Sequence, residues 1–563
     1  MRILISFLML ASTLLAQPKR PFPVVEATIT GMREALDSGR TTSRELVTQH
    51  LARIALYENK LHAVITVNPH VLDEADERDR ERAQGKPRGP LHGIPIALKD
   101  NILTHDIVTT GGALAFENYQ PPYDATLVKN LRAAGAIIIA KTTLSELANW
   151  VAGAPMPMPA NYNAVRGFAY NPYDPRRDPR EVPGDGRPVL STGGSSSGAG
   201  TAASFWAANV GTETSGSILS PANQNMLAAV KPTVGRISRY GVIPITADQD
   251  TAGPMARTVT DAAILLGALE SPAPDANDAA TKACQPPPGR DYTKFLNKNG
   301  LKGARIGIPR AFYYDKSTLP GRAGRGGEGL PPEQARLMTE AIDILKAQGA
   351  VIVDPADIPS VIAKDPASNL LLWNTCSGLN SVKGKDAGCS IVFKYGMKRD
   401  FNAFLSTLGD GAPVKTLKEL REWNINHITP GAIRFGQSQL DISDEMDLQA
   451  DRARYLLDRA KDLALAGKNG IDAVMKANQL DAILFPGASG AGIAAKPGYP
   501  TVIVPFGFVP NAGTPAYPNG FEARPAPMGV SFTGLACSEP RLLEIGYAFE
   551  QASRRRIPPP LFP

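Results

Sequence analysis

Apolar residues follow a repeating pattern along most of the chain: a longer stretch with helical spacing, then a short continuous apolar run. Three such pairs occupy residues 125–134 and 135–141, 332–348 and 351–353, and 471–479 and 482–485. The first spacing is typical of a helix with one buried face, and the second of a buried strand. This alternation predicts an α/β fold in which a single large domain has a central mixed β-sheet covered on both faces by helices.

Shorter signals place the remaining elements. Thr42 with Glu45 three residues later forms a capping box, which predicts that a helix begins at Ser43. Further helices are predicted at 24–36, 43–57, 73–84, 143–148, 259–269 and 540–553, and further strands at 93–101, 304–308, 502–505 and 530–532. Residues 149–190 are rich in Pro, Gly, Met and Arg without any periodicity, and we expect them to form a long surface insertion.

The N-terminal segment has the pattern of a secretory signal peptide. Arg2 is followed by an apolar run from Ile3 to Leu15 and then by Ala16. We therefore expect a signal peptide at residues 1–16 before a domain at 17–563, and an exported protein, periplasmic or secreted, without stable membrane association after cleavage. An uncleaved anchor is the alternative for this segment, and no later stretch of the sequence is apolar enough to cross a bilayer.

Composition and charge exclude several classes of function. The 563 residues carry 60 Lys and Arg against 54 Asp and Glu, and this scattered net charge of +6 indicates no nucleic-acid partner. The six histidines form no HExxH or comparable pattern, so neither a metal nor a cofactor is predicted. The four cysteines show no CxxC spacing, and a bridge between Cys376 and Cys389 stays open, as does the oligomeric state.

The stretch 192–221 holds the densest candidate chemistry. It opens with GGSSSG at 193–198 and closes with GTETSGS at 211–217, and the alanine-rich run 199–208 between them predicts a tightly packed helix. A Gly/Ser linker is the alternative, but apolar side chains such as Phe205 and Trp206 do not suit a flexible coil. Hydroxyls beside glycines, which let a ligand approach the backbone closely, suit nucleophilic acyl chemistry.

A serine hydroxyl becomes a good nucleophile only when a base removes its proton, and no histidine lies near these serines in the sequence. Lys99, however, ends the apolar strand predicted at 93–101. Burial disfavours the charged ammonium and lowers its pKa, so Lys99 could act as the base through a bridging serine. The alternative is a strand-end cation paired with Asp100.

Three separated motifs in this order resemble the amidase signature family. They are GIPIALKDNI at 93–102, GGSSSG at 193–198 and GTETSGSI at 211–218, and DTAGPMARTVTDAA at 250–263 and SEPRLLEIGYAFEQ at 538–551 extend the match. The resemblance covers the chain from about residue 24 to the final helix. Within the family, the sequence fits bacterial peptide amidases best.

The resemblance implies the amidase signature fold and a Ser-Ser-Lys triad with Ser217 as nucleophile, Ser195 as bridging serine and Lys99 as base. It also implies an oxyanion hole built from the backbone N–H groups of four residues, Thr214, Ser215, Gly216 and Ser217. Such an enzyme needs no cofactor and converts an amide into a carboxylate and ammonia or an amine through an acyl-enzyme. We expect a small-molecule or peptide amide as substrate, with C-terminal peptide amides favoured.

Other functions stay open at this point. A fatty-acid or aryl amide hydrolase would carry the same motifs, and so would an A-like subunit of a tRNA-dependent amidotransferase, although those subunits commonly have Arg where this chain has Leu219. An α/β-hydrolase could use Ser196, which satisfies GxSxG, with His427, but the strand expected before Ser196 is weak. A phosphate-binding P-loop would need GK[ST] where this chain has Ala199-Gly200.

Overall fold

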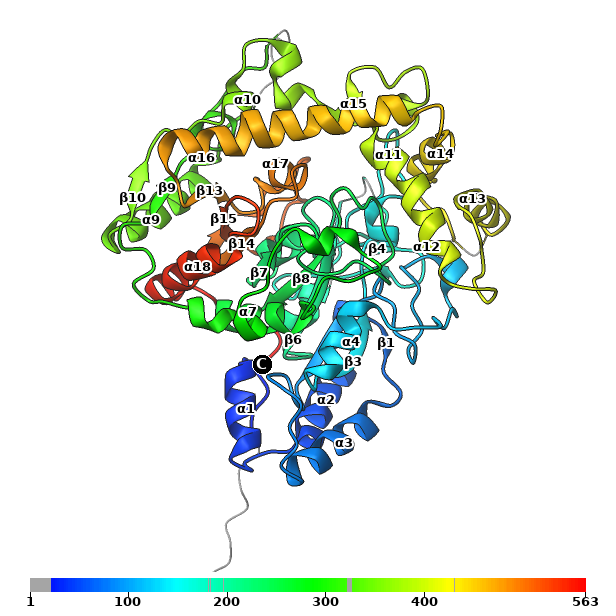
Figure 1. Cartoon of the computed structure of the whole chain (residues 1–563), viewed down its shortest axis with the longest axis vertical. Coiled ribbons are helices and arrows are strands. Elements are labelled where there is room, and N and C mark those ends of the chain that lie inside the picture. Colours follow the sequence, from blue (N-terminus) through cyan, green and yellow to red (C-terminus); the bar gives the residue numbers. More distant parts are fainter. Residues whose placement is uncertain (1–21, 181, 183, 196, 321–326, 430) are drawn as a thin grey trace, which may run out of the picture.

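The chain folds around a mixed β-sheet, which has eleven strands in the part of the chain that the structure describes (Figure 1). The structure is a computed structural model, and it describes residues 22–180, 182, 184–195, 197–320, 327–429 and 431–563. The predicted signal peptide at 1–16 lies outside the described residues. In sheet order the strands are β1 (Val64–Val67), β3 (Ile137–Thr142), β2 (Pro95–Lys99), β6 (Ala208–Glu213), β8 (Thr251–Ala256), β7 (Ala228–Lys231), β14 (Thr501–Val509), β15 (Ala526–Thr533), β13 (Ala482–Pro486), β9 (Arg305–Gly307) and β10 (Val351–Val353).

Both faces of the sheet are buried, which explains the continuous apolar runs of its strands. On β3, Ile138 packs in one hydrophobic cluster, whereas its neighbours Ile137 and Ile139 pack in another. On β14, Val502 and Val504 likewise share a cluster that excludes Ile503. Side chains alternate between the two faces of a strand. The cluster of Ile138, Val502 and Val504 therefore lies on one face of the sheet, and the clusters of the intervening residues lie on the other.

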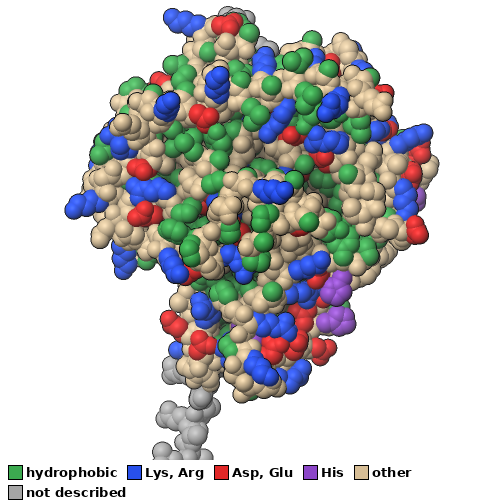
Figure 2. Space-filling model, in the orientation of Figure 1, with side chains coloured by type: hydrophobic (Ala, Val, Ile, Leu, Met, Phe, Trp, Pro, Cys, Tyr) green, Lys and Arg blue, Asp and Glu red, His purple; other side chains and the backbone are tan. Residues whose placement is uncertain are grey.

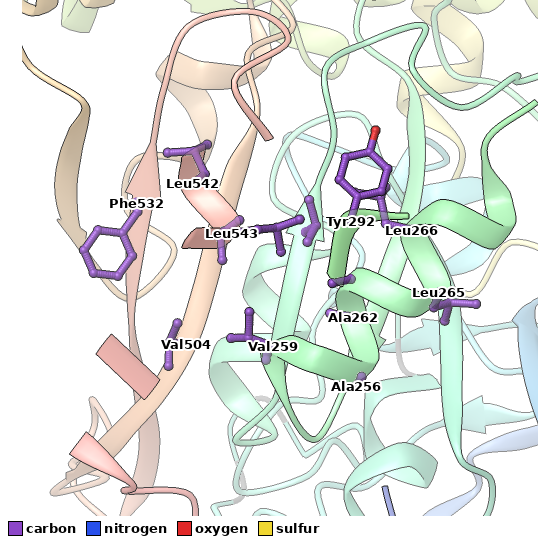
Figure 3. Packing of buried hydrophobic residues seen from close by; sticks show 14 of the residues in the cluster. Ala256, Val259, Ala262, Leu265, Leu266, Tyr292, Val504, Phe532, Leu542 and Leu543 are labelled. Carbon is purple, nitrogen blue, oxygen red and sulfur yellow. The ribbon is translucent and has the colours of Figure 1, made fainter. Parts of the chain in front are cut away.

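Helices cover each face, as predicted. The first face is packed by α1 (Ile29–Asp37), α4 (Thr126–Ala133), α7 (Val259–Leu269), α9 (Pro332–Ala347) and α18 (Glu539–Ser553). The other is packed by α2 (Ser43–Leu61), α3 (Val71–Ala83), α5 (Ser197–Ala202) and α6 (Leu219–Gln224). Figure 3 shows the first face, where Val259 of α7 and Leu543 of α18 lie beside Val504.

The remaining helices contribute partly to the first cluster, through Tyr313, Val361, Val474 and Ile493, and partly to clusters that contain no strand of the central sheet. These helices are α8 (Arg310–Tyr313), α10 (Pro359–Ile362), α11 (Val392–Gly396), α12 (Asn402–Ser406), α13 (Leu417–Asn426), α14 (Ser438–Asp444), α15 (Arg452–Leu463), α16 (Asp472–Asn478) and α17 (Ala491–Ala495). In Figure 1 the long helix α15 runs across the top of the molecule. No helix among the described residues has the length and apolar character needed to span a bilayer.

Two short two-stranded sheets lie outside the central one, and two disulfides cross-link the chain. Strands β4 (Tyr162–Asn163) and β5 (Gly167–Phe168) pair antiparallel, and β11 (Asn374–Thr375) and β12 (Cys389–Ser390) pair parallel. One disulfide joins Cys376 to Cys389, the pairing that the sequence left open, and the other joins Cys284 to Cys537.

Two predicted helices are wrong. Residues 143–148 contain only a 3₁₀ turn over Glu146–Asn149, because Leu147 and Ala148 adopt positive φ angles of 43° and 58° that a right-handed helix does not accept. The helix predicted at 199–208 ends at Ala202. Ser204 has φ 58°, and the chain then turns so that Trp206 Nε1 donates to Thr201 Oγ1 over 2.7 Å.

The predicted surface insertion at 149–190 is largely integrated into the fold. Tyr170 N donates to the carbonyl of Leu61 at the end of α2, and Tyr173 OH donates to the carbonyl of Ile557 near the C-terminus. Asn171 and Asp174 are fully buried. Buried polar side chains with long-range partners explain why this segment lacks periodicity and yet is ordered.

Charged side chains of both signs are mixed on the face of the molecule that Figure 2 shows, without a large field of one sign. This agrees with the small net charge of +6.

Candidate active site

The candidate chemistry gathers at one edge of the central sheet. Strands β2 and β6 are parallel neighbours, so Lys99 and the pair Thr212–Glu213 lie at the same edge. Strand β8 runs antiparallel to β6, and the register pairs its first residue, Thr251, with Glu213. The residues that precede β8 therefore reach the edge where β2 and β6 end.

The Lys99 side chain is completely buried at this edge. Its Nζ donates to the carbonyl oxygen of Thr212 over 3.1 Å and lies 2.8 Å from Thr212 Oγ1, which also accepts a hydrogen bond from Asn101 Nδ2. Burial lowers the pKa of Lys99 to about 7, although the carboxylates of Asp250 and Glu213 act in the opposite direction. A neutral amine at this position uses two N–H donors on Thr212 and keeps its lone pair for a proton.

The alternative that pairs Lys99 with Asp100 is wrong. Asp100 Oδ1 lies 3.1 Å from the ammonium of Lys141 on β3, and Asp100 Oδ2 accepts hydrogen bonds from the N–H and hydroxyl of Thr110. Lys141 therefore takes the carboxylate, which leaves Lys99 with uncharged hydrogen-bond partners among the described residues.

The structure brings Ser195 to the same carbonyl that holds Lys99. Ser195 is fully buried, and its Oγ donates to Thr212 O over 3.1 Å. Among the described residues, no hydrogen bond joins Lys99 directly to Ser195, or Ser195 directly to Ser217. Lys99 and Ser195 thus share the carbonyl oxygen of Thr212 as hydrogen-bond acceptor.

Ser217 lies against the glycines that precede Ser195. A methyl group added at Gly194 would lie 2.5 Å from Ser217 Oγ, and one added at Gly193, which has φ 76°, would lie 2.7 Å from the nitrogen of Pro221. Both glycines are therefore needed for the 193–195 segment to approach the loop after β6. Ser217 is partly exposed, unlike Ser195.

The loop 214–217 presents backbone donors that have no acceptor among the described residues. Among the described residues, the N–H groups of Thr214, Ser215, Gly216 and Ser217 donate no hydrogen bond, and Gly216 has φ 90°. The next two N–H groups, in contrast, donate to one carboxylate oxygen of the buried Glu213, over 2.8 and 3.0 Å. Glu213 thereby anchors the chain immediately after Ser217.

A second anchor was missed by the sequence analysis. Gln249 Nε2 donates to the carbonyl of Thr214 over 3.2 Å, and the Thr214 hydroxyl donates to Asp250 Oδ1 over 2.5 Å. Burial raises the pKa of Asp250 to about 7. The motif that begins at Asp250 was visible in the sequence, but its role follows only from the antiparallel placement of β8.

A cleft of about 430 Å³ opens beside this loop, because Ser215 and Gln249 are among its lining residues. Its walls are mostly apolar and include five aromatic side chains, Trp150, Phe312, Tyr313, Trp373 and Phe393. Lys496 is the charged residue of the lining, and it is neutralised by an ion pair with Asp462 over 2.5 Å. The cleft therefore suits an uncharged, apolar group.

Similarity to known proteins shows the family to which the chain belongs. The model of the amidase family matches residues 45–543. The chain belongs to the amidase signature family. It is therefore a hydrolase that acts on amide bonds, as the motifs implied.

Three relatives place this amidase within the family. It is 34% identical to a probable amidase of Arabidopsis thaliana, over 96% of this chain and 92% of that protein. The solved peptide amidase of Stenotrophomonas maltophilia is 35% identical, with a TM-score of 0.77 over 96% of this chain and 99% of that one. A putative amidase of Schizosaccharomyces pombe is 31% identical, over 95% of this chain and 87% of that protein.

The rival site built on His427 finds no support in the amidase. The His427 ring stacks on Trp423 at 3.8 Å between centroids, and its Nδ1 lies 2.7 Å from the Trp423 carbonyl oxygen. Ser196, the nucleophile of that alternative, lies outside the described residues. A cluster of His105, Asp106 and Asp124 has donor spacing suited to a cation, but Arg132 already pairs with both carboxylates.

The close approach of Gly194 to Ser217 predicts the effect of one methyl group. Gly194→Ala should reduce amide hydrolysis at least about a hundredfold, because the added carbon forces Ser217 Oγ, and the Ser217 Cβ at 2.9 Å, to move. Ammonia release and a thermal melt of the purified variant measure this. Gly411→Ala, at a position outside the cleft with open space around the added carbon, is the matched control. A fully active Gly194→Ala enzyme would contradict the packing described here.

Proposed function

We propose that the amidase attacks its substrate with Ser217, activated by Lys99 through Ser195. The observation that carries this proposal is the burial of the Lys99 amine within hydrogen-bond reach of the same Thr212 carbonyl that holds Ser195. A desolvated lysine with a pKa of about 7 is partly neutral at neutral pH and can accept a proton.

In this proposal the proton passes from Ser217 to Ser195 and from Ser195 to Lys99 as Ser217 Oγ forms a bond to the amide carbon. The Ser195 hydroxyl first turns from Thr212 O toward Lys99 Nζ. When the carbon–nitrogen bond breaks, the proton returns along the same path to the leaving nitrogen, which departs as ammonia or an amine. Water then hydrolyses the acyl-enzyme with the same groups.

The four N–H groups of 214–217, which have no acceptor among the described residues, are proposed to stabilise the oxyanion that develops on the carbonyl oxygen. Each such donor is worth about 3–4 kcal/mol in comparable sites. The anchors provided by Glu213, Gln249 and Asp250 support this role, because they hold the loop from both ends without using its donors.

We further propose that the substrate is a peptide with a C-terminal amide and an apolar last residue. The aromatic walls of the cleft favour an apolar side chain next to the scissile amide, and the similarity to a solved peptide amidase points to the same class. Free glutamine, the ammonia donor expected of a tRNA-dependent amidotransferase, carries two charges for which this cleft offers no unpaired partner among its described residues. A fatty-acid or aryl amide remains the second candidate, because the same walls accept it.

Export is proposed on two grounds. The pattern of residues 1–16 favours a signal peptide, and two disulfides are typical of proteins from oxidising compartments.

Removal of either end of the proposed relay should abolish turnover. Ser217→Ala and Lys99→Ala are each expected to lower kcat by at least about 10⁴-fold, and the double variant little further, because the residues act as one unit. Single-substrate kinetics of the purified variants measure this. Lys231→Met removes a buried lysine that likewise has no ion pair among the described residues and lies outside the proposed relay, and it should keep most of the activity. Substantial activity in the Lys99→Ala variant would contradict the proposed relay.

The pH dependence follows from the charge state of Lys99. If the neutral amine is the base, log kcat/KM should fall with unit slope below about pH 7 and level off above it, because protonation removes the acceptor. The value of about 7 already includes the opposing effect of the nearby carboxylates of Asp250 and Glu213, which favour the ammonium. Rates measured from about pH 5 to 9, with circular dichroism to confirm folding, test this; a rate constant that stays level down to the acid end contradicts it.

A panel of amides tests the substrate. Ammonia release should be fastest from amidated peptides that end in a large apolar residue, slower from fatty and aryl amides, and undetectable from glutamine. Ser217→Ala supplies the background rate. Glutamine hydrolysis that exceeds hydrolysis of every peptide amide would overturn the proposed substrate class while leaving the relay intact.

A further inference from the structure

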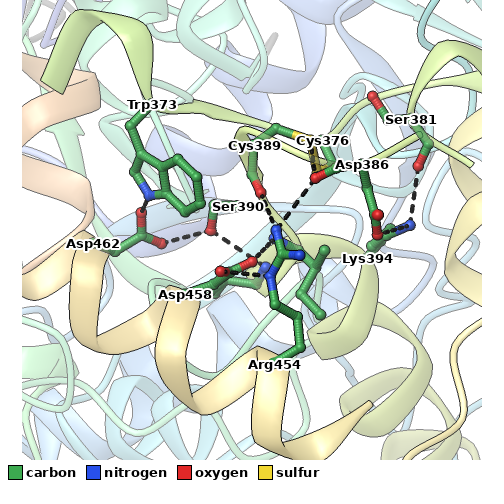
Figure 4. Close-up of a disulfide and its surroundings, with 12 residues drawn as sticks. Trp373, Cys376, Ser381, Asp386, Cys389, Ser390, Lys394, Arg454, Asp458 and Asp462 are labelled. Carbon is green, nitrogen blue, oxygen red and sulfur yellow. Dashed lines mark hydrogen bonds and ion pairs between the residues drawn. A yellow bond between two sulfur atoms is a disulfide. The ribbon is translucent and has the colours of Figure 1, made fainter. Parts of the chain in front are cut away.

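Helix α15 presents three charged side chains at four-residue intervals, Arg454, Asp458 and Asp462, and therefore on one helical face. Figure 4 shows them along the segment that contains the Cys376–Cys389 disulfide. Arg454 donates to the carbonyl of Cys389 over 3.1 Å, and Asp458 accepts the N–H of Ile391 over 3.0 Å. The helix thus holds β12 along its whole length.

The disulfide extends this support to the neighbouring strand. Strand β11 begins at Asn374, directly after Trp373, and pairs with β12, and the Cys376–Cys389 bond joins the residue that follows β11 to the first residue of β12. Trp373, a residue of the cleft wall, is therefore attached to a small cross-linked sheet that is itself docked on α15.

Asp462 connects this scaffold to the cleft. One of its carboxylate oxygens accepts the Ser390 hydroxyl over 2.9 Å (Figure 4). The other accepts Trp373 Nε1 over 2.9 Å and the ammonium of Lys496 over 2.5 Å, and both of these residues line the cleft. Asp462 is only 1% exposed, so these three partners replace water as the groups that stabilise its buried carboxylate.

The Trp373 ring is held on a face as well as at its edge. The Lys461 ammonium lies 3.9 Å from the ring centroid, a cation–π contact, while Asp462 holds the indole N–H. An aromatic side chain fixed at both places forms a rigid wall, and a rigid apolar wall discriminates between substrates by the apolar surface that they bury against it.

Building on the hydrolase function proposed above, we propose that Trp373 determines specificity for amides whose last residue has an aromatic or large aliphatic side chain, and that Asp462 is the positioning residue that holds it. Asp462 bonds to Trp373, Ser390 and Lys496, and among the described residues no hydrogen bond or ion pair joins it to the three residues of the proposed relay. Its effect is therefore on the choice of substrate and not on the proton relay.

The test compares three blocked dipeptide amides that differ only in the last residue, phenylalaninamide, leucinamide and glycinamide. In the wild-type enzyme, kcat/KM should be highest for phenylalaninamide. Trp373→Ala should lower the phenylalaninamide-to-glycinamide ratio at least about tenfold, mainly through a higher KM for phenylalaninamide. Asp462→Ala should lower the same ratio about three- to tenfold, because Trp373 keeps its ring but loses its fixed orientation.

Two further variants separate positioning from folding. Trp373→Phe keeps an aromatic ring and lacks the indole N–H bonded to Asp462, so its phenylalaninamide-to-glycinamide ratio should fall between those of the wild type and Trp373→Ala. This variant tests the positioning role even if Asp462→Ala does not fold. Asp472→Asn, which alters a carboxylate bonded to Tyr499 outside the cleft wall, is the matched control and should keep the wild-type ratio.

The outcomes are distinct. A ratio within about twofold of wild type in Trp373→Ala overturns the specificity role, and a wild-type ratio in both Asp462→Ala and Trp373→Phe overturns the positioning role. If the wild-type enzyme releases ammonia from none of the three peptides but hydrolyses other amides, the proposed substrate class has failed, and this inference fails with it.

Discussion

The proposed chemistry depends on the burial of the Lys99 amine beside a serine, without an ion pair to a carboxylate among the described residues. Three strands of the described sheet carry a buried lysine, and the three ammonium groups have different partners. Lys141 has the carboxylate of Asp100 at 3.1 Å, and Lys231 donates to two backbone carbonyls on the far side of β8 from β6. Lys99 has only Thr212 and lies beside a serine, so desolvation can lower its pKa without a neighbouring ion pair to restore the charge.

That arrangement is a consequence of strand register. The backbone of Thr212 can hold both Lys99 and Ser195 only because β2 and β6 are parallel and Leu98 lies opposite Val210. A slip of one residue would turn Lys99 to the opposite face of the sheet. The apolar residues of β2, whose side chains belong to clusters on two faces, make such a slip costly and so protect the placement of the amine.

How much of this could be predicted from the sequence varies with the element. The strand that ends at Lys99 and the helix at 259–269 follow from local apolar pattern, and the structure has both. Strand β6 was missed, because ANVGTE consists mostly of small and polar residues and is a strand only through its neighbours β2 and β8. The helix expected at 199–208 ends early for a local reason: the turn at Ser204 and the contact between Trp206 and Thr201 outweigh alanine propensity.

The candidate site divides in the same way. Motifs were enough to propose Lys99, Ser195 and Ser217 as the site, an assignment that stays a prediction. The contact of Gln249 and Asp250 with Thr214 could not be predicted, because it requires β8 to run antiparallel to β6. The pairing of Cys284 with Cys537, 253 residues apart, was equally out of reach.

The difference between what the sequence predicts and what it does not has a physical basis. The proposed relay lies where strands of the central sheet end, whereas the cleft is lined by side chains from several distant segments. Lys99 and Thr212 lie at the ends of β2 and β6, and the register of these strands fixes their positions. Local sequence motifs reflect this part of the structure. The walls come from segments far apart in the chain, around Trp150, Phe312, Trp373 and Phe393, and they are held by side-chain contacts such as those of Asp462. Substitutions in such contacts can reshape the cleft without moving Lys99. Substrate choice is therefore the property that the shared motifs of this family determine least, and it has to be argued from the packing of each wall.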